Sequence, residues 1–80
     1  MDELSEQEVL RQLAEVCGTD AIDTERDVDL FDAGLLDASR VTQLLGGLAD
    51  SLGITVRADD VERDELATVN RILTFVAERL

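Results

Sequence analysis

The 80-residue sequence predicts one all-α domain over residues 1–80, a four-helix bundle with three main helices, one short helix and a long first loop. Three observations support this fold class. Apolar residues recur at helical spacing in three segments, capping residues stand at the start of those segments, and glycines follow two of them. The hydrophobic fraction of 45% is enough to give a chain of this length a core.

The first helix is expected from about Glu6 to Cys17. Ser5-Glu6-Gln7-Glu8 has the pattern of a capping box, in which a serine accepts an amide hydrogen bond and a glutamate reaches back. Gly18 follows as a typical C-terminal glycine. The apolar face of this segment contains Val9, Leu10, Leu13, Val16 and Cys17.

The segment from Thr19 to Asp37 shows no sustained helical period and is rich in acidic residues. A loop of this length is long for a compact domain, and such loops usually have a function. We expect Leu30 and Phe31 to insert into the core through a short turn and so to hold the loop in place.

A second helix is expected to begin after Asp37, which is well placed as its N-cap, and to end at Gly53. Its apolar stripe is Val41, Leu44, Leu45, Leu48 and Leu52. The opposite stripe, expected to face solvent, is Arg40, Gln43, Gly47 and Asp50. Gly46 and Gly47 each cost about 1 kcal/mol relative to alanine in mid-helix. We interpret the two glycines mainly as tolerated by the helix, and less as a sign that another group approaches this face closely.

After this helix, Ile54-Thr55-Val56 is expected to form a short extended stretch with two inward residues. Asp59 and Asp60 can cap a short turn or helix that runs to about Asp64. Thr68 is expected to cap the last helix. The apolar face of that helix is Val69, Ile72, Leu73, Val76 and Leu80.

The charge of the chain bears on its partners and location. Nineteen acidic residues against seven basic ones give a formal net charge of −12, which disfavours nucleic acid and favours protein partners with basic patches. No apolar run approaches the roughly 20 residues of a membrane span. The acidic N-terminus is unlike a signal peptide, and one cysteine cannot form a disulfide within the chain. We expect a cytoplasmic monomer.

Several residue types needed for catalysis are missing. The chain has no histidine and no lysine, so most arrangements of a general base with a nucleophile cannot be assembled. Carboxylate pairs remain, but acidic side chains on a small bundle usually lie in water. The sequence therefore predicts a protein that is not an enzyme.

Two other candidate sites have simpler interpretations. An EF-hand loop needs glycine at its sixth place and glutamate at its twelfth. Counted from Asp23 or Asp27 the sixth place is not glycine, and counted from Asp29 the twelfth place is Arg40. Cys17 lies on an apolar face, without a basic sequence neighbour or a redox motif. We interpret them as a solvated acidic loop and a core residue, and expect no metal.

The segment Asp29-Leu30-Phe31-Asp32-Ala33-Gly34-Leu35-Leu36-Asp37, followed by an amphipathic helix, resembles the phosphopantetheine-dependent acyl carrier proteins. The resemblance is closest to D-alanyl carrier proteins and other stand-alone aminoacyl carriers, in which the segment reads Gly-Leu-Leu-Asp-Ser. It extends over nearly the whole chain, including residues 54–56 and 66–72. It implies an acyl-carrier-like bundle that holds an acyl or aminoacyl group as a thioester on a 4′-phosphopantetheine arm. In the family the arm is bound to a serine hydroxyl at an exposed helix start, where the helix dipole favours its phosphodiester.

In this chain the residue after Asp37, where the family has the attachment serine, is Ala38. With position 38 as origin, the family's apolar positions fall on Leu44, Leu45, Leu48 and Leu52. With Ser39 as origin, one of them falls on Gly46 and the pattern fails. Position 38 is therefore the expected attachment position, with Ser39 as the alternative.

The missing hydroxyl leaves two explanations open. One is a serine-to-alanine change made at position 38 to keep a carrier unmodified, which we favour. The other is a natural relative that has lost the arm or uses Ser39, whose hydroxyl at a helix start could otherwise be an ordinary polar first-turn residue. Ser39 and Thr42 also stand where the family usually has apolar residues. The cofactor of the parent form would be 4′-phosphopantetheine, and we expect this chain to lack it.

The resemblance implies as partners a phosphopantetheinyl transferase and an adenylating loading enzyme, an acyltransferase or both. The docking surface is expected on the second helix, from Asp37 to about Asp50, and on the end of the first loop. Its residues are Leu36, Asp37, Arg40, Gln43 and Gly47. A composition typical of GC-rich genomes favours polyketide or nonribosomal-peptide biosynthesis over D-alanylation of teichoic acid. The alternative of another class is an acidic regulator that binds a basic protein, in which Ala38 would be native.

Overall fold

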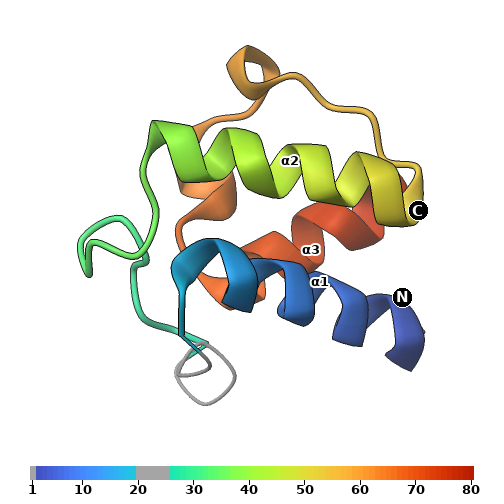
Figure 1. Ribbon diagram of the computed structural model, residues 1–80, viewed down its shortest axis with the longest axis horizontal. Helices are drawn as coiled ribbons and strands as arrows, with labels where there is room; N and C mark the ends of the chain where they lie inside the picture. The colour runs from blue at the N-terminus through green and yellow to red at the C-terminus, as the bar shows by residue number, and fades with distance from the viewer. Residues whose placement is uncertain (1, 20–25) are drawn as a thin grey trace.

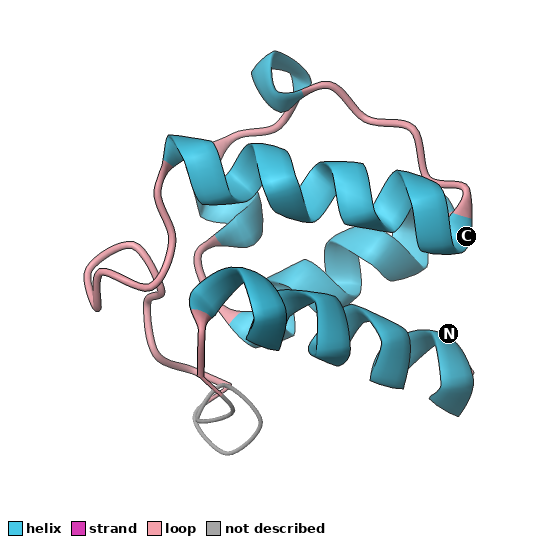
Figure 2. Ribbon diagram, in the orientation of Figure 1, coloured by secondary structure: helices cyan, strands magenta, loops and turns pink. Residues whose placement is uncertain are grey.

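The computed structural model describes residues 2–19 and 26–80. Its helices are α1 (Glu3–Cys17), α2 (Ala38–Leu52), the 3-10 helices η2 (Ala58–Asp60) and η3 (Arg63–Leu66), and α3 (Val69–Arg79). No β-strand occurs in the described residues (Figure 2). The predicted all-α fold is confirmed, with two 3-10 turns in place of one short helix. Residues 20–25 of the predicted first loop, including Asp23, lie outside the described residues.

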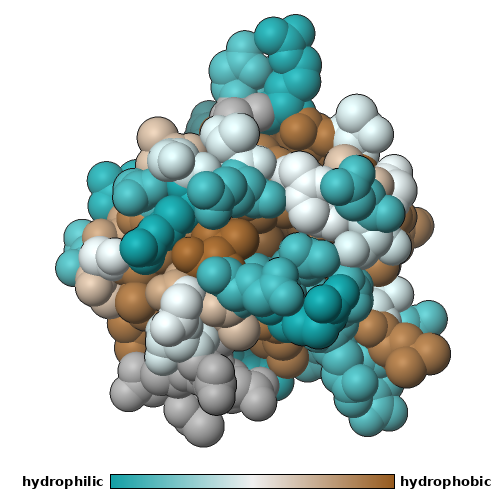
Figure 3. Space-filling view, viewed as in Figure 1, coloured by the Kyte–Doolittle hydropathy of each residue, from teal (hydrophilic) through white to brown (hydrophobic). Residues whose placement is uncertain are grey.

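The three α-helices enclose one core. α1 and α2 run antiparallel, and α3 crosses behind them (Figure 1). On the face seen in Figure 3, hydrophilic residues are interspersed with apolar ones, which show between α1 and α2 and also at the edges of the view. No helix of the described part of the chain is long and apolar enough to cross a membrane. The fully buried large side chains are Leu13, Leu30, Leu44, Leu48, Leu66, Ile72, Val9, Val69 and Val76.

α1 starts earlier than the sequence pattern indicates. Asp2 is the N-cap, and its carboxylate accepts a hydrogen bond from the Ser5 amide at 2.8 Å. This bond lowers the pKa of Asp2. Glu3 and Glu6 then lie in the first turn, where the helix dipole favours negative charge. The predicted capping box at Ser5 is therefore wrong, while the end of the helix at Cys17 and Gly18 is confirmed.

α2 has the predicted boundaries. The Asp37 carboxylate accepts a hydrogen bond from the Arg40 amide at 2.9 Å, as an N-cap should. Gly53 ends the helix with φ +71°, in the left-handed region that favours glycine, and its amide donates to the Ala49 carbonyl. The apolar stripe is confirmed, with Leu44, Leu45 and Leu48 buried.

The predicted solvent-facing stripe of α2 is correct for Gln43 and Asp50 but wrong for Arg40 and Gly47, which are half-buried. A Cβ at Gly47 would collide with the carboxamide of Gln12 on α1, whereas one at Gly46 would meet nothing within 4 Å. The helix thus merely tolerates a glycine at position 46, whereas at position 47 the Gln12 side chain approaches closely.

The chain after α2 follows the prediction in outline. Ile54 is buried and Val56 half-buried in an extended stretch. Thr68 caps α3 by accepting from the Arg71 amide at 3.1 Å. Phe75 is also buried on the apolar face of α3, although it was not predicted there. Leu80 was predicted on this face, but it is 56% exposed.

Candidate functional site

The predicted attachment position lies at the exposed start of α2. Ala38 is the first residue of the helix and is exposed, directly after the capping Asp37. The first amides of a helix lack partners within the helix, so this end attracts anions. Position 38 therefore has the setting that a phosphodiester prefers.

A compact turn before α2 fixes the approach to this position. The Asp29 carboxylate accepts from the amides of Phe31 and Asp32, at 2.9 and 3.1 Å. The amides of Leu35 and Leu36 both donate to the Leu30 carbonyl, at 2.9 and 3.1 Å. The turn thus folds residues 29–36 around one carbonyl group.

The turn is anchored at both of its leucines. Leu30 is 1% exposed, as expected, and its amide donates to the Ala67 carbonyl at 2.7 Å. Leu36 is 3% exposed and enters the core just before α2. Gly34, with φ +76°, supplies the left-handed residue that lets the chain reverse between them. Farther back, Asn70 on α3 donates to the Asp27 carboxylate at 2.6 Å.

A cleft of about 590 Å³ opens beside position 38. It lies between the start of α2, the turn before it and the η3 segment. Its walls are Phe31, Leu36, Asp37, Ala38, Val41, Thr42, Val61, Glu62, Arg63 and Leu66. The lining combines apolar side chains with charged ones of both signs, Asp37 and Glu62 against Arg63.

One wall of the cleft is closed by a pair of residues far apart in sequence. The Arg63 guanidinium lies over the Phe31 ring, 4.6 Å from its centroid, and 3.7 Å from an Asp32 carboxylate oxygen. A cation over an aromatic face is attracted by the ring quadrupole. This pair ties η3 to the turn across the cleft.

Ala38 and Ser39 differ in where their side chains leave the helix. Ala38 lines the cleft together with Val41 and Thr42. Ser39 is exposed but does not line the cleft, because successive helical residues are about 100° apart around the axis. Ser39 lies instead on the strip that carries the exposed Gln43.

The structure separates the five residues predicted as a docking surface. Leu36 and Asp37 lie at the cleft, and Gln43 is exposed on the outer strip. Arg40 turns back toward the preceding loop, where its guanidinium donates to the Leu35 carbonyl at 3.0 Å. Gly47 lies about two turns after Arg40, against α1.

Seven cleft residues were absent from the predicted site: Phe31 in the turn, Val41 and Thr42 on α2, and Val61, Glu62, Arg63 and Leu66 after α2. Phe31 was expected to be buried in the core, but it is only half-buried. The four residues after α2 lie near position 38 only because of the path that the folded chain takes. No local pattern marks them.

Charge is distributed unevenly around the site. α2 carries one basic and one acidic residue, Arg40 and Asp50, so the helix itself is neutral. Acidic residues lie instead at the Asp37 cap and in the segment 59–65 that contains parts of η2 and η3: Asp59, Asp60, Glu62, Asp64 and Glu65. Any attraction of a basic partner therefore acts beside α2 rather than on it.

Cys17 is a buried thiol at the end of α1. Burial raises its pKa, and the positive charge of Arg40 partly opposes that rise. A raised pKa keeps the thiol protonated and unreactive at neutral pH. No group of three acidic or cysteine residues in the described segments is placed to hold a metal ion.

Comparisons with known proteins agree with this geometry. Residues 7–76 match the family described as Phosphopantetheine attachment site. The chain belongs to this family of phosphopantetheine carrier proteins, as its motif indicated.

Similar relatives include several D-alanyl carrier proteins. The chain is 42% identical over 72 residues to the one from Bacillus velezensis, covering 90% of this chain and 92% of the relative. It is 41% identical over 78 residues to those from Bacillus cereus and Bacillus anthracis, covering 98% of each chain.

Proposed function

We propose that this chain has the scaffold of a stand-alone aminoacyl carrier, in which position 38 corresponds to the arm-bearing serine of loadable relatives. One observation carries the proposal: position 38 is the first residue of α2, exposed, directly behind the Asp37 cap and at the mouth of the cleft. A phosphodiester at this point would gain from the free amides and the helix dipole.

The residues present do not fit covalent attachment at this position. A phosphopantetheine arm is bound through a side-chain oxygen, and Ala38 offers a methyl group. The neighbouring hydroxyl of Ser39 is exposed but leaves the helix away from the cleft. We propose that the chain with Ala38 does not receive an arm at position 38 and that Ser39 does not replace it.

The relatives bear on the cargo. They are named D-alanyl carrier proteins, which favours D-alanine over the polyketide or nonribosomal-peptide cargo expected from composition. The partners would be a phosphopantetheinyl transferase and an adenylating enzyme, which supply the chemistry. The carrier itself would act as a cytoplasmic monomer without catalysis.

The first test restores the hydroxyl. The unsubstituted chain, Ala38→Ser, Ser39→Ala and the double variant are incubated with coenzyme A and a phosphopantetheinyl transferase, and their intact masses are measured. Only the two chains that carry the Ala38→Ser substitution should gain the mass of one arm. A mass gain in the unsubstituted chain that Ser39→Ala abolishes would show that Ser39 is the attachment residue. No gain in Ala38→Ser would overturn the carrier proposal.

A second test addresses the cargo. The loaded Ala38→Ser protein is offered D-alanine, L-alanine and acyl donors with the adenylating enzyme of a D-alanylation system. We expect a thioester with D-alanine, read as a further mass increase that hydroxylamine removes. Preferred loading with another acid would overturn the D-alanyl assignment and leave the carrier scaffold standing.

Ala38 also favours a second candidate function. A chain that keeps the carrier fold but lacks the hydroxyl would bind carrier-recognising enzymes without being modified, as an acidic regulator. The unsubstituted chain should then inhibit arm transfer to the Ala38→Ser protein competitively, with an inhibition constant close to the KM of that protein. Absence of inhibition at tenfold excess would exclude the regulator.

A further inference from the structure

The first turn of α2 contains a residue that helix electrostatics disfavours. Arg40 is the third residue of the helix, where a negative side chain would suit the helix dipole and a positive one opposes it. The first turn itself contains no acidic residue, and the negative charge at this end of the helix comes from the Asp37 cap. A residue that breaks a local rule is expected to have a compensating role.

The geometry of Arg40 supplies such a role. Its guanidinium is half-buried and turns back out of the helix to the Leu35 carbonyl, at 3.0 Å between Nη1 and the oxygen. Its own amide donates to the Asp37 carboxylate at 2.9 Å. The two ends of one residue thus hold the segment immediately before α2, on both sides of Leu36.

Without the Arg40 side chain, of its ties to α2 this segment would keep only the one at Asp37, because the Asp37 cap bonds to the Arg40 backbone amide, which a substitution leaves in place. The amides of Leu35 and Leu36 would still bond to the Leu30 carbonyl, and Leu36 would still enter the core. These contacts join the segment to the preceding turn. The bond from Arg40 to Leu35 joins it to α2 as well.

We infer that Arg40 is a positioning residue that clamps residues 35–37 to α2, so that the attachment position and the turn before it meet a partner enzyme as one rigid unit. The inference rests on the proposed carrier function for its kinetic consequence. The clamp itself is a property of the chain and is tested separately. A preorganised surface loses less freedom on docking, so removing the clamp should raise the KM of a carrier more than it lowers kcat.

The test is made in the loadable Ala38→Ser background, with three further changes at arginines. Arg40→Ala removes the clamp, and Arg40→Lys keeps a positive donor. Arg71→Ala is the matched control, because it removes the same charge from an exposed position on α3. Arm transfer from coenzyme A is measured for KM and kcat, and amide hydrogen exchange is measured for each protein.

A charged hydrogen bond of this kind corresponds to roughly a tenfold effect. Arg40→Ala should raise KM about tenfold and should speed exchange at the Leu35 and Leu36 amides by a similar factor. Exchange at Leu45 and Leu48, in the middle of α2, should stay unchanged. Arg40→Lys should recover part of both effects, and Arg71→Ala should change neither.

Three results would overturn the clamp. Unchanged exchange at Leu35 and Leu36 in Arg40→Ala would show that no clamp exists, even if transfer slows because a partner contacts Arg40 directly. Faster exchange with unchanged KM would show that the clamp does not matter for docking. Faster exchange throughout α2 would show a general loss of stability. If Ala38→Ser receives no arm, the carrier proposal fails, and the exchange data still decide whether the clamp exists.

Discussion

The two halves of α2 are held in place by different kinds of contact. The first half, which contains position 38, is tied to the preceding loop by the Asp37 cap and the Arg40 side chain, both within five residues in sequence. The second half is tied to α1, where Gln12 lies against Gly47 and donates to the Ser51 hydroxyl at 2.9 Å.

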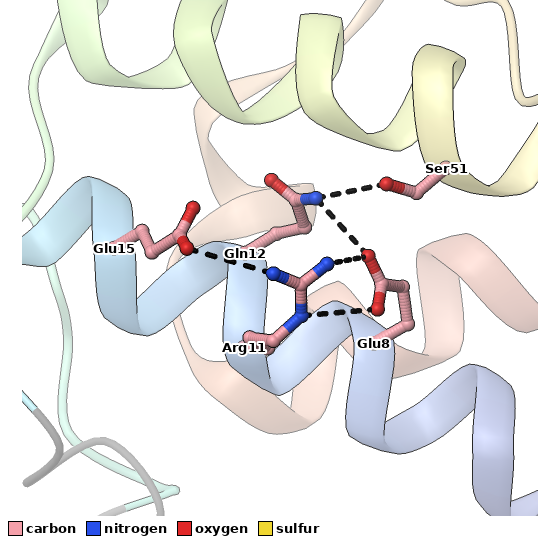
Figure 4. Close-up of polar contacts among 5 residues, drawn as sticks. All are labelled: Glu8, Arg11, Gln12, Glu15 and Ser51. Atoms are coloured by element: carbon pink, nitrogen blue, oxygen red, sulfur yellow. Dashed lines mark hydrogen bonds and ion pairs between the residues drawn. The ribbon is translucent and has the colours of Figure 1, made fainter.

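The link to α1 is part of a small polar network (Figure 4). Glu8 accepts from Gln12 at 3.1 Å and from Arg11 Nε at 3.1 Å, and Arg11 also pairs with Glu15 at 3.6 Å. The difference between the halves indicates a division of tasks. Long-range contacts at the second half fix the helix in the bundle, while local contacts at the first half shape the surface that a partner would meet.

The largest expected effect is in the core of the second half. Leu48 is fully buried, so Leu48→Ala leaves a cavity and should lower the free energy of unfolding by roughly 2–5 kcal/mol. Val41→Ala, at the half-buried cleft wall, should cost clearly less. Urea denaturation of both variants measures their free energies of unfolding. If Val41→Ala lost as much stability as Leu48→Ala or more, the proposed division of tasks between the two halves of α2 would be contradicted.

The next effect is at the cap of the first half. Asp37→Ala removes the acceptor for the Arg40 amide and should lower the free energy of unfolding by about 1 kcal/mol. Asp37→Asn keeps an acceptor without the charge and should cost much less. Hydrogen exchange of the Arg40 amide should quicken in the first variant, and equal exchange in both would count against the cap.

The adjacent glycines give a matched pair in mid-helix. Gly46→Ala should stabilise the protein by up to about 1 kcal/mol, because nothing stands near the new Cβ. Gly47→Ala should gain less or lose stability, because the Gln12 carboxamide must move away from Ser51. Gln12→Ala combined with Gly47→Ala should recover the helix-propensity gain. Thermal denaturation distinguishes the variants, and equal stabilisation by both glycine substitutions would disprove the close approach.

The smallest effect is a pH dependence at the α1 link. Hydrogen bonds from Arg11, then Gln12 and Ser51, lower the pKa of Glu8 from 4.5 to about 2. Because this pKa is lower in the folded protein than in the unfolded chain, Glu8 stabilises the fold above pH 4.5, and the contribution is lost as the pH falls toward 2. Since Glu8 is at the surface, solvent keeps the effect small.

Glu8→Gln should therefore flatten the loss of stability between about pH 5 and pH 2, measured by urea denaturation at each pH. Glu78→Gln on α3 is the control for removing one negative charge. If the stability of the two variants depends on pH in the same way, the hydrogen bonds to Glu8 do not stabilise the fold.

The features that sequence alone predicted are those set by near neighbours. Asp37 and Gly53 bound α2 because a cap bonds to an amide or carbonyl within four residues. The buried stripes follow from helical geometry. The same local rules failed at α1, where Asp2 and Ser5 are both good caps. The added first turn exposes Leu4 and so leaves no apolar signal.

The features that were missed depend on distant residues. Periodicity shows which stripe of α2 faces away from the core. It does not show that Gln12, 39 residues before Ser51, covers Gly47, or that a long side chain such as Arg40 folds back. In the same way, position 38 could be placed from its motif, while the far wall of its cleft, with Arg63, depends on the path of the chain after α2.

The buried cysteine has a practical consequence for this bundle. Cys17 ends α1 where that helix lies beside the start of α2 (Figure 1), and it is the one thiol of the chain. Because the thiol is buried, an alkylating reagent reacts with it through local opening of the fold, so the labelling rate of the unsubstituted chain reports that opening. The protein thus carries an intrinsic chemical probe of motion at this end of the bundle, with no substitution or added label.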